Sequence, residues 1–149
     1  MAVEKKDQFW RRRLRHGRRP IFEDPIKLWE AAVEYFVYTD KRVIKKQDYV
    51  GKDAIKVYRE FSPPYTITGL CVDLGISLDT WINYKKRSDF LDIINDIEQI
   101  IYSQKFEGAA AGVYNANIIA RDLGLAEKTE NKHDVTPPVI ENGKDLPDE

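Results

Sequence analysis

An uncharged stretch near the C-terminal end constrains the fold most, because no Asp, Glu, Lys or Arg interrupts the run from Gly108 to Ala120. A surface helix keeps charged residues on its solvent face, so this run cannot form an ordinary surface helix. Its small side chains allow a neighbouring helix to approach closely, and we expect a helix over about 109–122. An apolar stripe predicts another helix over about 89–106, bent or ended by Gly108. The two would form a long helical hairpin over about 89–123.

The preceding helix can cover only one face of this uncharged segment. Its two asparagines and the adjacent Arg121 need hydrogen-bond partners, which implies a second neighbour. A neighbouring subunit would provide them, and packing within one monomer is an equal alternative on physical grounds. We assign the subunit contact to Gly108, Ala111, Gly112, Asn115, Asn117 and Arg121.

The first part of the core is predicted to contain one helix and one β-hairpin. Apolar residues recur at three- and four-residue spacing after Pro25, which indicates a helix over about 25–38 with Asp24 as its N-cap. Two β-rich runs separated by Val-Gly-Lys-Asp then indicate a hairpin over about 43–58. A two-stranded hairpin is marginally stable alone, so we expect it to pack against something. The fold class is therefore mainly α with one β-hairpin.

Residues 66–87 have the pattern of a helix-turn-helix-like unit. Thr68 would cap a short first helix, Gly75 would form the turn, and Ser77 or Asp79 would start the second helix. This second helix could enter the DNA major groove, but its beginning lacks base-reading side chains and Asp79 would repel phosphates. A small helical packing unit is an equal alternative. The secondary DNA-binding candidates are Lys85, Lys86 and Arg87.

Charges are sorted by position although the net charge is only −1. Residues 1–20 form a basic N-terminal arm with eight Lys/Arg against two Asp/Glu, and residues 126–149 form an acidic tail with seven Asp/Glu against three Lys. Residues 21–125 lie between them as a helical core and oligomerisation domain. Arginine-rich arms bind phosphates without needing a fold, whereas solvated ends are the simpler alternative. The proposed DNA-binding residues are Lys5, Lys6, Arg11, Arg12, Arg13, Arg15, Arg18 and Arg19.

Several classes of function find no support in the sequence. No glycine-rich loop precedes Lys-Ser/Thr, so no nucleotide-phosphate site is expected. His16, Cys71 and His133 are far apart, and Asp89, Asp92 and Asp96 suit a solvated face better than a metal site. We expect no catalytic residue, cofactor or metal. One cysteine, no secretory signal and no membrane-length apolar run favour a cytosolic protein without a membrane partner.

Several segments resemble the small terminase subunit, the DNA-packaging protein of headful-packaging, short-tailed double-stranded DNA bacteriophages. The resemblance covers most of the chain in order, most specifically over residues 100–125, and only weakly over 41–61. It rests on "FW" (9–10), "HGRRPIFEDPIKLWEAAVEYF" (16–36), "TITGL" (66–70), "LDTWINYKKRSDF" (78–90), "IIYSQKFEGAAAGVYNANIIARDLGL" (100–125) and "DVTP" (134–137).

The resemblance implies a non-enzymatic homo-oligomeric ring that recognises viral double-stranded DNA and hands it to the large terminase subunit, an ATPase and nuclease. It also implies the host cytoplasm, not the mature virion, and places the uncharged stretch at a subunit interface. Relatives end in a basic segment expected to touch DNA, whereas this chain ends "ENGKDLPDE". We therefore assign DNA binding to residues 5–19 and contact with the large subunit to the tail. The alternative is a dimeric helix-turn-helix transcription regulator that uses residues 78–87.

Overall fold

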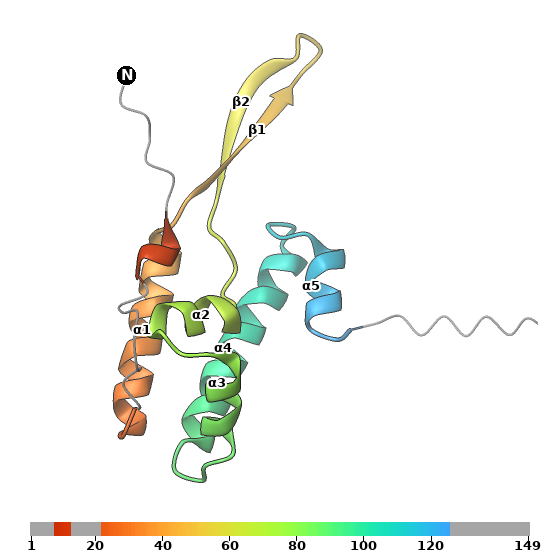
Figure 1. Ribbon diagram of the computed structural model, residues 1–149. Helices are drawn as coiled ribbons and strands as arrows, with labels where there is room; N and C mark the ends of the chain where they lie inside the picture. The colour runs from red at the N-terminus through yellow and green to blue at the C-terminus, as the bar shows by residue number, and fades with distance from the viewer. Residues whose placement is uncertain (1–7, 13–21, 126–149) are drawn as a thin grey trace, which may run out of the picture.

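A computed structural model describes residues 8–12 and 22–125, and its elements confirm a mainly helical chain with one antiparallel hairpin. Helices α1 and α4 lie side by side, α2 and α3 cover them, and the hairpin projects from one end (Figure 1). The elements are η1 (Phe9–Arg12), α1 (Pro25–Lys41), β1 (Ile44–Val50), β2 (Ile55–Phe61), α2 (Ile67–Leu74), α3 (Leu78–Lys85), α4 (Leu91–Ala110) and α5 (Ala116–Asp122).

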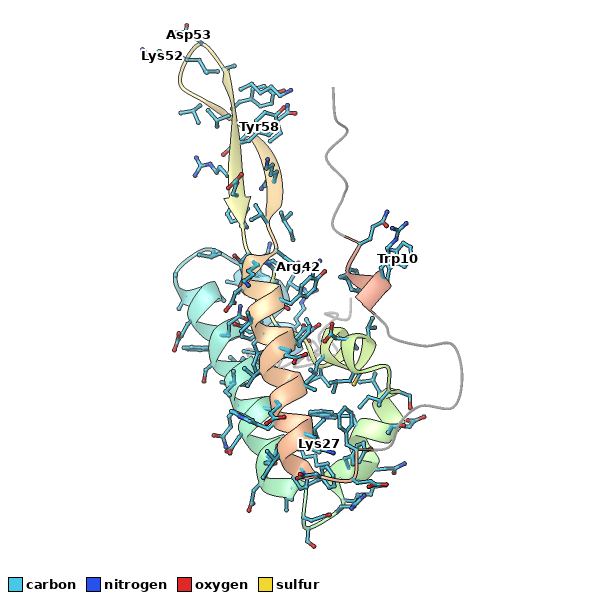
Figure 2. The ribbon with its side chains drawn as sticks, turned by 90° about the vertical axis from the view of Figure 1, so that its left-hand side faces the viewer. Trp10, Lys27, Arg42, Lys52, Asp53 and Tyr58 are labelled. Atoms are coloured by element: carbon cyan, nitrogen blue, oxygen red, sulfur yellow. The ribbon has the colours of Figure 1, made fainter. Side chains whose placement is uncertain are left out.

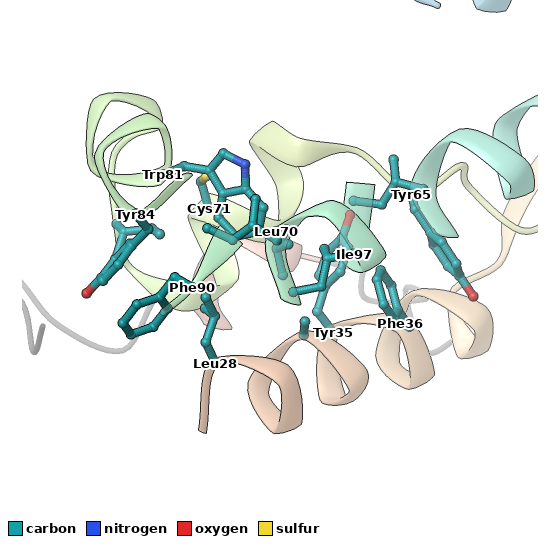
Figure 3. Close-up of a cluster of buried hydrophobic side chains, with 14 residues drawn as sticks. Leu28, Tyr35, Phe36, Tyr65, Leu70, Cys71, Trp81, Tyr84, Phe90 and Ile97 are labelled. Atoms are coloured by element: carbon teal, nitrogen blue, oxygen red, sulfur yellow. The ribbon is translucent and has the colours of Figure 1, made fainter. Parts of the chain in front are cut away.

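The core lies between the facing sides of α1 and α4 and is closed by α2 and α3 (Figure 3). Leu28 of α1, Leu70 of α2 and Ile97 of α4 have no exposed surface. Phe90, at the start of α4, is also fully buried and packs on the Tyr84 ring of α3 with centroids 4.8 Å apart. The apolar spacing in the sequence thus corresponds to one contiguous core.

Helix α1 begins as predicted and ends later than predicted. The Asp24 side chain accepts a hydrogen bond from the Ile26 N–H (2.9 Å), and Pro25 occupies the first turn. The helix continues to Lys41, beyond the expected end near residue 38. Thr39 is fully buried, and its hydroxyl donates a hydrogen bond to the Tyr35 carbonyl (2.8 Å). Because this bond satisfies the hydroxyl, a polar residue can occupy an apolar face of the helix.

The hairpin pairs Ile44 with Phe61 at its base and Val50 with Ile55 at its tip. The second strand ends at Phe61, so the predicted range of 43–58 was too short on that side. Gly51 has a φ of 79°, a conformation that glycine adopts without steric cost, and it starts the connecting turn. The outer part extends away from the helices, and most of its side chains are exposed (Figure 1).

Two helices connected by a short turn occupy residues 67–85, with one cap misplaced by the sequence analysis. Thr66, not Thr68, caps α2, because its hydroxyl accepts from the Gly69 N–H (2.9 Å). Gly75 ends α2 in the left-handed conformation as predicted, with a φ of 70°. Ser77 caps α3 by accepting from the Thr80 N–H, which decides between the two predicted N-caps.

The uncharged stretch is not one helix, and the prediction of a helix over 109–122 was wrong. Helix α4 passes through Gly108 and continues to Ala110, so Gly108 does not end it. A turn follows in which Gly112 has a φ of 73° and the N–H groups of Val113 and Tyr114 both bond to the Gly108 carbonyl. The short helix α5 then folds back on α4 and buries Ile119. The small residues thus end one helix and form a tight turn.

The buried thiol of Cys71 predicts a loss of stability at alkaline pH. Burial raises the pKa of this thiol from 9.0 to about 11. The unfolded chain therefore releases the thiol proton first, and stability present below pH 9 is lost as the pH rises toward 11. The expected loss is about 2–3 kcal/mol in the free energy of unfolding, measured by urea titration between neutral and alkaline pH.

The Cys71→Ala variant is the matched control for this prediction. It should lose less stability over the same pH range, while the contribution of Tyr65 remains. The pKa of Tyr65 is also raised, first by burial and then by its hydrogen bond to Asp40. An identical pH dependence in both proteins would show that Cys71 contributes nothing to it.

Candidate DNA-binding and subunit-contact surfaces

The described part of the predicted DNA-binding arm is η1, which contains Arg11 and Arg12. Arg11 is exposed, and its guanidinium carbon lies 5.4 Å from the centre of the Trp10 ring. The other predicted arm residues lie outside the described residues. These are Lys5, Lys6, Arg13, Arg15, Arg18 and Arg19.

Helix η1 is held where α1 leads into the hairpin. The Arg42 guanidinium lies 5.0 Å from the Phe9 ring and 5.9 Å from the Tyr38 ring, a geometry that favours cation–π attraction. Helix η1 also packs against α2, and Phe9 lines a cavity of about 220 Å³ with Tyr35 and Tyr38. The described part of the basic arm, η1, therefore lies beside the foot of the hairpin, near Arg42 (Figure 2). Arg42 was not singled out from the sequence because nothing local marks a partner more than thirty residues away.

Two of the three cations at the end of α3 bond to carboxylates of the same chain. Lys85 bonds to Glu98 on α4, which also accepts from the Trp81 indole N–H (3.1 Å). Arg87 donates to both carboxylate oxygens of Asp89 (3.1 and 2.7 Å), and this pairing lowers the pKa of Asp89. These contacts help to join α3 to α4. They leave Lys86 as the candidate most accessible to phosphates.

The predicted subunit-contact residues lie on three consecutive segments at one end of the helical core. Gly108 is in the last turns of α4, Ala111, Gly112 and Asn115 are in or next to the connecting turn, and Asn117 and Arg121 are on α5. All except Gly108 are exposed. The structure thus places these residues on one accessible region.

Contacts within the chain explain two residues whose chemistry had suggested a neighbouring subunit. A Cβ at Gly108 would lie 2.2 Å from Cε2 of the Tyr114 ring, so a side chain of this chain occupies that space. Asn115 caps α5 by accepting from the N–H groups of Asn117 (3.0 Å) and Ile118 (3.2 Å). The small residue and the amide therefore have partners within the chain, as in the second of the two alternatives that the sequence left open.

Exposed apolar side chains on the same region were missed in the sequence analysis. Ile118 is 66% exposed and Val113 is 46% exposed. Together with Ile44 at the hairpin base they line a groove of about 640 Å³ between the hairpin and the α4–α5 turn. Ile118 and Ile119 are adjacent, so only one of them can face α4 when they lie on a short helix. The short length of α5 was not predicted, and the exposure of Ile118 was therefore missed.

A chain of hydrogen bonds fixes the segment that leaves the hairpin. The side-chain Oε1 of Gln104 accepts from the Tyr65 N–H (3.0 Å), and its Nε2 donates to the Tyr114 hydroxyl (2.8 Å). The Tyr65 hydroxyl in turn donates to Asp40 at 2.6 Å. Burial raises the pKa of Tyr114. One amide on α4 therefore connects the exit of β2 with the α4–α5 turn.

Neither a metal site nor a membrane span is found among residues 8–12 and 22–125. No group of three or more His, Cys, Asp or Glu side chains is placed to hold a metal ion in that part of the chain. In the same ranges, no helix is both long and apolar enough to cross a membrane.

Comparison with known proteins identifies the family. The family described as "DNA-packaging protein gp3" matches residues 17–131. The small terminase subunit of Salmonella phage P22 is 43% identical over 143 residues, which cover 92% of this chain and 85% of the phage protein. The chain belongs to this family of DNA-packaging proteins. The resemblance to small terminase subunits found in the sequence is thereby confirmed.

In this member of the family, the contact between Gly108 and Tyr114 predicts a specific stability effect. Gly108→Ala should lower the free energy of unfolding by about 1–3 kcal/mol, because the new Cβ overlaps the Tyr114 ring. In a Tyr114→Ala background the same change should be neutral or stabilising by about 1 kcal/mol, because alanine favours a helix more than glycine does. Denaturant titrations at one protein concentration measure both values. Equal losses in the two backgrounds would contradict the intramolecular explanation.

Proposed function

We propose that this chain is a non-catalytic packaging factor that forms a closed homo-oligomeric ring, recognises viral double-stranded DNA and recruits the large terminase subunit. It would act in the host cytoplasm at the start of genome packaging. The observation that carries this proposal is the match to the packaging family over residues 17–131, together with 43% identity to a small terminase subunit.

Exposed apolar residues on the last turns of α4, on the α4–α5 turn and on α5, together called the α4–α5 region, support assembly through this surface. Ile118 and Val113 are exposed there, and Tyr102 and Phe106 are exposed on α4. A ring requires two different faces of each subunit to meet, so this surface would contact a different part of its neighbour. Asn117 and Arg121 add exposed polar groups that can form hydrogen bonds across such a contact.

The basic arm supports DNA binding, and the acidic tail suits a protein partner better than DNA. The arm residues 1–20 hold eight Lys/Arg, and a polyanion such as DNA attracts them without regard to sequence. Residues 126–149 hold seven Asp/Glu, which would repel phosphates. We therefore assign the tail to contact with the large terminase subunit, the ATPase and nuclease of the packaging system.

The first test concerns assembly. Ile118→Glu should lower the mass of the native assembly, because a charge would be buried at the contact. Gly112 is a poorer probe, since its φ of 73° would strain any larger residue there. Native mass spectrometry measures the mass, and circular dichroism checks that the helices remain.

Ile26→Glu is the matched control, because Ile26 is similarly exposed (60%) but lies in the first turn of α1. It should leave the mass unchanged. A wild-type protein that is only monomeric or dimeric would reject the ring, and a dimer would favour the alternative of a helix-turn-helix regulator. A full-mass assembly of Ile118→Glu would remove this residue from the interface.

The second test concerns the tail. Deletion of residues 126–149 should leave the number of subunits in the assembly unchanged and abolish co-purification with the large terminase subunit. Pull-down from cells expressing both proteins, with mass measurement of the truncated assembly, checks the two outcomes together. Loss of the assembly would instead assign a structural role to the segment Val-Thr-Pro-Pro-Val-Ile (135–140).

A further inference from the structure

The hairpin differs in charge from the helices around it. Residues 44–61, which form the hairpin, contain five Lys/Arg and three Asp/Glu. Residues 22–43 contain three Lys/Arg and five Asp/Glu, and residues 62–125 contain five Lys/Arg and eight Asp/Glu. A positive segment therefore projects from a negative helical core. Lys52 at its tip and Lys27 at the far end of α1 mark the two extremes (Figure 2).

The strand register places cations on both faces of the hairpin. Residues directly opposite in the register share a face, so Lys46 and Arg59 lie together on one face, where Arg59 also pairs with Asp48. On the other face Tyr49 lies opposite Lys56. Among the described residues Lys46 and Lys52 have no ion-pair partner, and both side chains are exposed.

The ion pairs of the hairpin leave its positive charge available to a ligand. Lys45 pairs with Glu60 at 3.7 Å and Arg59 with Asp48 at 2.7 Å, and all four side chains are at least 42% exposed. Exposed pairs of this kind are weak and exchange readily for other anions. The net positive charge of the segment remains after every possible pair is formed.

We propose that the β1–β2 hairpin is a DNA-binding ribbon that contacts the phosphates of a double helix and extends the surface of the basic arm. A two-stranded β-ribbon fits the DNA major groove, which is about 12 Å wide. Seven residues per strand give a ribbon roughly 24 Å long at about 3.4 Å per residue. Tyr49 and Tyr58 are exposed beside the lysines, and phenolic hydroxyls are common phosphate donors.

The position of the arm supports the same partner. Arg42 holds Phe9 at the foot of the hairpin, so the arm residue Arg11 and the hairpin cations belong to one region. One DNA duplex could contact both. The inference rests on the proposed function in one respect, namely that this protein binds double-stranded DNA.

The test compares full-length variants in binding to a fluorescently labelled DNA duplex of mixed sequence at several salt concentrations. The variant Lys46→Gln/Lys52→Gln/Lys56→Gln should bind more weakly, and the slope of log affinity against log salt should fall by about 0.9 for each phosphate that a lysine no longer neutralises. The single variants Lys52→Gln and Lys27→Gln remove the same charge from opposite ends of the molecule. Only Lys52→Gln should weaken binding, and Asp53→Asn at the hairpin turn should strengthen it.

Three outcomes would overturn the inference, and they are distinguishable. Unchanged affinity and slope in the triple variant, with weaker binding by Arg11→Gln/Arg12→Gln, would leave DNA binding with the arm alone. A smaller native assembly in the triple variant would assign the hairpin to contact with another copy of the chain. Failure of the wild-type protein to bind the duplex would reject the DNA-binding part of the proposed function as well.

Discussion

The burial of Phe90 is the contact on which the helical arrangement depends. Its ring has no exposed surface and lies at the junction of α3 and α4, against Tyr84 and beneath the Arg87 guanidinium at 4.5 Å. Leu28 of α1 is buried in the same cluster (Figure 3). Complete burial of such a side chain contributes roughly 2–3 kcal/mol. Because Phe90 immediately precedes α4, its position also fixes where the longest helix starts.

That long helix determines where the functional surfaces lie. Helix α4 runs the length of the core, and its last turns carry the α4–α5 region, while α1 beside it leads into the hairpin (Figure 1). Both projections therefore leave the core at the same end. Asp92, in the first turn of α4, is separated from the basic hairpin by most of the length of the core.

Local signals in the sequence predicted much of the fold. Asp24 and Gly75 were identified as caps, and Ser77 as one of two candidate N-caps, because each acts on backbone groups close to it in the sequence. Gly108 was misinterpreted because its role is not local. Glycine usually interrupts helices, but here it provides space for the Tyr114 ring six residues later. The contact between Phe9 and Arg42 could not be predicted, because it depends on tertiary packing. For the candidate site, the positive charge of the arm was evident from composition. The positive charge of the hairpin suggested a role only once the structure showed that the hairpin projects from the core.

The connection between the hairpin and the core has a mechanical consequence. Pro63 and Pro64 follow β2, and proline restricts the backbone to a narrow range of φ. After these prolines, Tyr65 forms hydrogen bonds with both Asp40 and Gln104. These bonds anchor the segment that follows β2 to α1 and to α4. The outgoing strand begins three residues after the end of α1. Because both of its ends are held, the hairpin is rigidly attached to the helical core. A force applied at its tip would therefore be transmitted as torque to α1 and α4.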